Sequence, residues 1–155
     1  MKAQLEDNTK PRSQEQRDIQ DMLQHASFAK RYIKRREALA EFLETSVPAK
    51  QFSMRVISVP YRDKYGHSRF KGCIGGWLTQ MAPKAFRRYV CKDTNRKKLN
   101  RPIDEYVSSD ALRFTGDYLG IQGLGRYLTD THARHKTPTK AAAFIRKYLL
   151  RKDSL

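Results

Sequence analysis

Cysteine, long apolar runs and, over much of the chain, glutamate are all scarce in this sequence of 155 residues. The two cysteines, Cys73 and Cys91, are too few for a disulfide framework, and neither has a second cysteine at the spacing of a familiar zinc site. No apolar run approaches the roughly 18 residues that cross a bilayer, and the first twenty residues contain no apolar segment of the signal-peptide type. We therefore expect a reduced, cytoplasmic or nucleoid-associated protein that has no membrane partner, no metal and no cofactor.

The charge of the chain is strongly one-sided. Lysine and arginine number 32 against 16 acidic residues, which gives a net charge of +16. Residues 46–100 hold 13 of these bases and 2 acids, a net of +11, and no glutamate occurs between Glu44 and Glu105. A surface that faces only water usually interleaves both signs. This segment therefore predicts a cationic face that is neutralised by a polyanion, and nucleic acid is the first candidate.

The N-terminal third has the pattern of helices. Ser13 and Gln16 have the spacing of a capping box, and an apolar stripe follows at helical intervals. We predict helix over most of residues 14–45, with a break near residues 25–27. Residues 1–12 lack periodicity and are expected to form a flexible tail. The remainder, residues 13–155, is expected to form a single nucleic-acid-binding domain.

The centre of the chain alternates apolar and polar residues, which is typical of strands. We predict a β-hairpin that pairs residues 52–61 with 68–79. Pro83 is placed to begin a short helix, and Thr137 followed by Pro138 to begin the last one. The predicted fold class is therefore α+β: an N-terminal helical segment, a central β-hairpin that forms a small antiparallel sheet, and a helical C-terminal half.

Basic side chains on and beside this hairpin are the predicted contacts to nucleic acid. A two-stranded ribbon fits the major groove of DNA, and arginine and lysine neutralise phosphates. The predicted nucleic-acid-binding residues are Arg55, Arg62, Lys64, Arg69, Lys71, Arg87, Arg88, Arg96, Lys97, Lys98, Arg134, Lys136 and Lys140. Tyr61 and Tyr65 are candidates for stacking on bases.

The resulting hypothesis is a non-enzymatic protein that binds double-stranded DNA in a regulatory, replication or recombination accessory role. It has three alternatives. The first is an RNA-binding protein or a component of a ribonucleoprotein particle. The second is a small metal-independent ribonuclease that uses His67, His132 or His135 as acid or base. The third is a basic adaptor for an acidic protein. A homodimer fits the DNA hypothesis, because many DNA-binding proteins pair through helices to match two half-sites.

Overall fold

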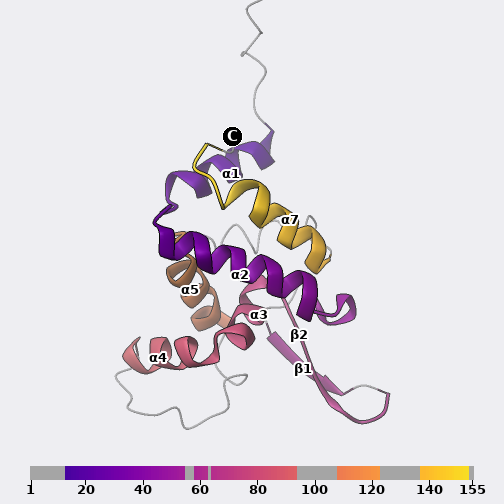
Figure 1. Cartoon of the computed structure of the whole chain (residues 1–155). Helices are drawn as coiled ribbons and strands as arrows, with labels where there is room; N and C mark the ends of the chain where they lie inside the picture. The colour runs from indigo at the N-terminus through magenta and orange to yellow at the C-terminus, as the bar shows by residue number, and fades with distance from the viewer. Residues whose placement is uncertain (1–12, 55–57, 63, 94–107, 123–136, 154–155) are drawn as a thin grey trace, which may run out of the picture.

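The computed structural model of the chain describes residues 13–54, 58–62, 64–93, 108–122 and 137–153 (Figure 1). The expected tail, residues 1–12, lies outside this described part. The helices and strands are α1 (Gln14–Gln24), α2 (Lys30–Ser46), the 3-10 turn η1 (Ala49–Gln51), β1 (Ser58–Arg62), β2 (Ser68–Gly72), α3 (Ile74–Met81), α4 (Pro83–Asp93), α5 (Ser108–Leu119) and α7 (Pro138–Tyr148). No described helix is both long enough and apolar enough to span a bilayer.

The predicted α+β class, built on a central β-hairpin of residues 52–61 and 68–79, is wrong, because the described chain is predominantly helical and its described strands are two segments of five residues each. The strand that was expected to continue to residue 79 stops at Gly72, and the residues after Cys73 form α3. What pairs is a two-stranded antiparallel ribbon, β1 with β2, whose free end extends away from the helices (Figure 1). The physical reason is that Ile74, Trp77 and Leu78 recur at helical spacing and are all buried.

Gly75 of α3 serves helix packing. A Cβ atom at Gly75 would lie 3.0 Å from the hydroxyl oxygen of Thr115 on α5. Gly75 therefore lets α3 and α5 approach closely, and only a residue without a side chain fits there without movement of a neighbour.

Helix α2 lies at the centre of the molecule. It packs along α7 on one side and against α3 and α5 on the other (Figure 1). Leu39, Ala40 and Leu43 of α2 are completely buried. Each buried leucine contributes about 1.5–3 kcal/mol relative to an exposed one. This central position makes α2 the element on which the rest of the fold is assembled.

Several predicted helix boundaries are confirmed. Ser13 caps α1 in a capping box with Gln16, and the long N-terminal helix is broken between α1 and α2. Pro83 begins α4. Thr137 caps α7 by accepting a hydrogen bond from the backbone N–H of Lys140, with Pro138 in the first turn.

Arg36 of α2 is completely buried and ties together three chain segments. Its Nε donates to the carbonyl of Leu119, its Nη1 to that of Leu149, and its Nη2 to those of Ser27 and Gly120. Leu119 and Leu149 stand at the C-terminal ends of α5 and α7, where unpaired carbonyls carry partial negative charge. Burial lowers the pKa of Arg36 to about 10, so the guanidinium stays charged at neutral pH.

Candidate nucleic-acid interface

The structure describes only part of the predicted contact set. Arg55, Arg96, Lys97, Lys98, Arg134 and Lys136 lie outside the described residues, as do His132 and His135. Tyr61, Arg62 and Arg69 are described as strand residues of β1 and β2, without their side chains. The predicted residues with described side chains are Lys64, Tyr65, Lys71, Arg87, Arg88 and Lys140.

These residues do not form one continuous face. Lys64 and Tyr65 lie in the turn between β1 and β2, which extends from the opposite side of the molecule to α4 (Figure 1). Tyr65 is 73 % exposed, and the ammonium of Lys64 lies 5.1 Å from the centre of its ring. Lys140 stands at the start of α7, which lies across α2 from α4. The cations of α4 therefore have to be considered by themselves.

Helix α4 carries a stripe of cations along its outer face. We call Lys84, Arg87, Arg88 and Lys92 the α4 stripe; all four are exposed. They stand at positions i, i+3, i+4 and i+8, which share one side of a helix. At 1.5 Å per residue the stripe is about 12 Å long. The helix presents this side because Phe86 and Val90, on its other side, are each 1 % exposed and pack into the core.

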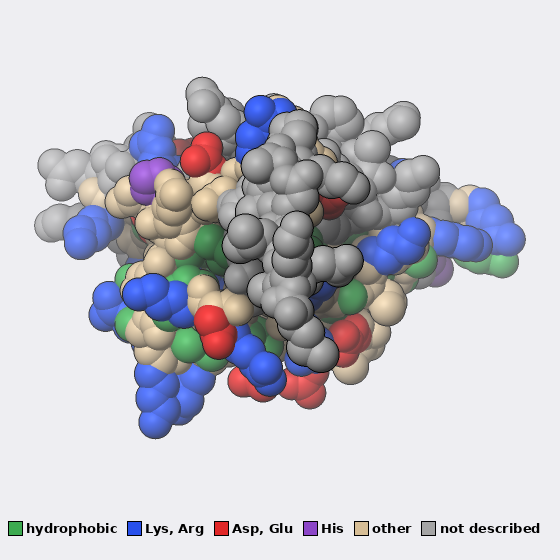
Figure 2. Space-filling view, turned by 90° about the horizontal axis from the view of Figure 1, so that it is seen from above, with side chains coloured by type: hydrophobic (Ala, Val, Ile, Leu, Met, Phe, Trp, Pro, Cys, Tyr) green, Lys and Arg blue, Asp and Glu red, His purple; other side chains and the backbone are tan. Residues whose placement is uncertain are grey.

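The α4 stripe has no acidic partner within the described residues: none of its four side chains makes an ion pair or hydrogen bond there. Arg146 of α7 provides the contrast. Its Nε and Nη2 donate hydrogen bonds to the two carboxylate oxygens of Glu44 on α2, at 3.1 and 3.0 Å. Hydrogen bonding to Glu44 raises the pKa of Arg146. The end of the molecule at which α1 lies likewise shows acidic and basic side chains together (Figure 2).

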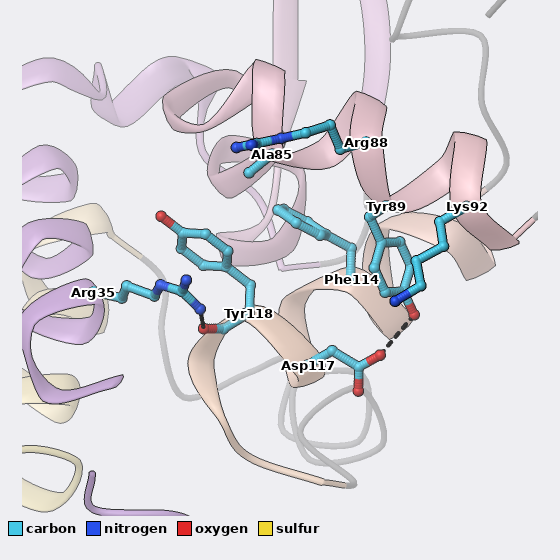
Figure 3. Close-up of a pocket in the computed structure, with 8 residues that line it drawn as sticks. All are labelled: Arg35, Ala85, Arg88, Tyr89, Lys92, Phe114, Asp117 and Tyr118. Atoms are coloured by element: carbon cyan, nitrogen blue, oxygen red, sulfur yellow. Dashed lines mark hydrogen bonds between the residues drawn. The ribbon is translucent and has the colours of Figure 1, made fainter. Parts of the chain in front are cut away.

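A pocket of about 280 Å³ opens beside the stripe, between α2, α4 and α5 (Figure 3). Arg88 and Lys92 belong both to the stripe and to the pocket lining. From α2, Arg35 places its guanidinium 4.3 Å from the centre of the Tyr118 ring and donates to the Tyr118 carbonyl at 3.0 Å. The remaining lining residues are Ala85, Tyr89, Phe114, Asp117 and Tyr118.

Aromatic rings and one exposed carboxylate line the rest of this pocket. Phe114 is buried and lies with its ring centre 5.2 Å from that of Tyr118 and 5.5 Å from that of Tyr89. The hydroxyl of Tyr89 donates to Oδ2 of Asp117 at 2.8 Å, which connects α4 to α5. The pocket thus combines two exposed cations, a carboxylate and an aromatic wall.

Groups that would support other chemistry are separated in the described chain. Within that part, no three side chains of histidine, cysteine, aspartate or glutamate gather at a point where a metal ion could bind. Cys73 is buried where α3 begins, whereas Cys91 is half-buried on α4. His67, a candidate for the ribonuclease hypothesis, is exposed in the turn between the strands and has the ring of Tyr65 near it at 6.3 Å.

Comparison with known proteins gives no assignment: no family model, curated protein or solved structure matches the chain. The sequence prediction includes Arg87 and Arg88 but not Lys84 and Lys92, although the helical spacing of these lysines from the two arginines is visible in the sequence. The pocket cannot be predicted from sequence spacing, because Tyr89 and Asp117 are 28 residues apart and meet only in the folded chain.

Proposed function

We propose that this protein binds nucleic acid without acting on it chemically, that duplex DNA is its ligand, and that the α4 stripe contacts the phosphate backbone. The single observation that carries the proposal is the row of four exposed cations on α4, which have no ion pair with any of the described residues. Holding like charges side by side destabilises a folded protein unless an anion neutralises them. The same function implies that the protein acts in the cytoplasm or on the nucleoid.

Duplex DNA suits the dimensions of this stripe. B-DNA carries one negative charge for about every 1.7 Å of its axis, so a stripe about 12 Å long faces several phosphates. The major groove is wide enough to admit a helix such as α4. Residues 83–93 contain no asparagine or glutamine, the residues that read adenine, and the side chains there suited to guanine are the four cations of the stripe itself. We therefore expect binding that depends strongly on salt and weakly on sequence.

The test is a salt titration of binding to a labelled duplex, followed by fluorescence anisotropy. Four phosphate contacts predict a slope of log affinity against log salt of about −3.6. The double variant R87Q/R88Q should reduce the size of that slope by about 2 and leave the melting temperature unchanged, because neither side chain has a partner in the described structure.

A matched control separates the stripe from the overall charge. The double variant R17Q/K152Q removes the same two charges at the end of the molecule where α1 and the C-terminus lie, away from α4 (Figure 1). It should bind DNA with the wild-type slope. An equal loss for both double variants would show that net charge alone drives binding, and a wild-type slope near zero would overturn the proposal.

The same titration decides between the remaining hypotheses. Structured RNA that binds more tightly than duplex DNA at equal salt would make RNA the ligand. Cleavage of that RNA in the presence of EDTA would favour the ribonuclease, and its loss in His67→Ala would assign the histidine. If no nucleic acid binds, the hypothesis of an acidic protein partner is favoured. Sedimentation with and without duplex would show whether two copies bind together.

A further inference from the structure

The pocket beside the α4 stripe has the composition expected of a nucleotide site. Its volume of about 280 Å³ lies just below the range of sites for drug-sized ligands and suits a group as small as a single nucleotide base. Its lining includes the exposed side chains of Arg88 and Lys92 (Figure 3). Because these two cations also belong to the stripe, a strand whose phosphates lie on α4 passes the mouth of the pocket.

The aromatic wall favours a base over any other part of a nucleic acid. Tyr89 and Tyr118 are half-buried and line the pocket on either side of Phe114. Arg35 adds a planar guanidinium beside Tyr118. Unpaired bases stack on aromatic rings and on arginine planes, whereas the bases of a continuous duplex have their faces covered by their neighbours. Only an unpaired base can therefore use this wall.

Asp117 distinguishes a base site from a phosphate site. A carboxylate repels a phosphate, so a pocket that served phosphate alone would be weakened by this residue. A carboxylate does accept hydrogen bonds from the amino groups of bases. Tyr89 fixes the position of this carboxylate through Oδ2, and the described residues supply no partner for Oδ1.

We propose that this pocket receives an unpaired base of the strand whose phosphates lie on the α4 stripe. The protein then binds DNA with a single-stranded end or gap in preference to a continuous duplex. This inference rests on the proposed function, since the stripe brings the strand to the pocket, and it adds the form of nucleic acid that is recognised.

The test compares three labelled ligands on the wild-type protein: a blunt duplex, the same duplex with a short single-stranded overhang, and that duplex with an overhang of abasic nucleotides. The abasic overhang has the same phosphates and no bases. We expect the overhang with bases to bind about tenfold more tightly than the abasic one, as stacking of one base provides. Equal affinity for the two overhangs would overturn the inference.

Two variants locate the effect. Ala85 lines the pocket, so Ala85→Leu fills part of it and should abolish the difference between the two overhangs while the blunt duplex binds as before. Arg87→Gln and Arg88→Gln form a matched pair on one helix, because only Arg88 lines the pocket. Both should reduce the salt slope by about 1, and only Arg88→Gln should also reduce the preference for the overhang with bases.

The failures of the two proposals are distinguishable. Salt-dependent binding of all three ligands with equal affinity for the two overhangs removes the pocket from recognition and leaves the proposed function in place. Binding of the base-containing overhang alone supports the pocket and overturns the proposal that a continuous duplex is a ligand. Absence of binding to all three overturns both.

Discussion

The guanidinium of Arg36 donates a hydrogen bond of 2.9 Å to the carbonyl oxygen of Leu119, joining the middle of α2 to the end of α5. The same guanidinium binds the carbonyl of Leu149 after α7. Its acceptors are four backbone carbonyls, and no carboxylate pairs with it among the described residues. The partial negative charge at helix C-termini therefore compensates for much of the cost of burying a full positive charge.

Replacing Arg36 should destabilise the whole fold. Arg36→Met leaves buried carbonyls without a donor, and we expect a loss of about 3–5 kcal/mol in the free energy of unfolding. Arg36→Lys keeps the charge, but an ammonium cannot match the planar set of donors, so it should recover only part of the loss. Urea denaturation measures both variants. Lys34→Met, at an exposed neighbouring position, is the control and should stay within about 0.5 kcal/mol of wild type.

Gly120 ends α5 in the left-handed region, with φ +69°, and lies against the ring of Tyr32. A Cβ atom there would come within 2.6 Å of Cγ of that ring. We expect Gly120→Ala to lower the melting temperature more than Gly66→Ala, which has a similar φ of +78° but no atom within 4 Å of its Cβ position. Backbone strain is common to both changes and costs about 1–2 kcal/mol, so the difference between them measures the contact with the ring.

A second mutation checks this explanation for Gly120. In the Tyr32→Ala background the ring is absent, so the stability cost of Gly120→Ala should fall to about that of Gly66→Ala, because only the backbone strain then remains. An unchanged cost in the Tyr32→Ala background would mean that another contact is responsible.

The secondary structure predicted from the sequence differs most from the observed one where a segment is completely buried. Residues 73–81 are apolar or small at nearly every position, so their pattern fits a buried strand as well as a buried helix. The N-terminal helices were predictable because polar residues alternate with the apolar stripe and Ser13 supplies a cap. Periodicity identifies an element only when one of its faces remains in water.

Arg36 shows the same limit for charged residues. It stands in a run of bases, from Lys30 to Arg36, that the sequence places partly on the outer face of the helix. Arg36 is instead the buried member, because the four carbonyls that bind it come from segments up to 113 residues away. The pocket beside α4 depends on such distant pairings as well. The sequence does not distinguish a cation on a solvated helix face from a buried one that binds the carbonyls at the ends of other helices.

Burial raises the pKa of the Cys73 thiol above its ordinary value of 9.0. In the unfolded chain this thiol ionises near pH 9, whereas the folded chain keeps the proton, so the free energy of unfolding should fall as the pH rises through 9. We expect the stability difference between wild type and Cys73→Ala to narrow between about pH 8 and pH 10, by at most about 1.4 kcal/mol per pH unit. Urea denaturation at the two pH values measures it, and a constant difference would contradict the assignment.

Cys91 offers a direct probe of the α4 stripe, because it is half-buried on the same side of the helix as Arg87, Arg88 and Lys92. A maleimide should modify Cys91 in the folded protein and reach Cys73, which is 3 % exposed, only after unfolding. If DNA lies on the stripe, saturating duplex should slow the modification of Cys91 several-fold, and high salt should restore the rate by releasing the DNA. Cys91→Ala identifies the reacting thiol. An unchanged rate with duplex bound would place the DNA on another face, because a strand that covers Arg87 and Arg88 also blocks the approach to this sulfur.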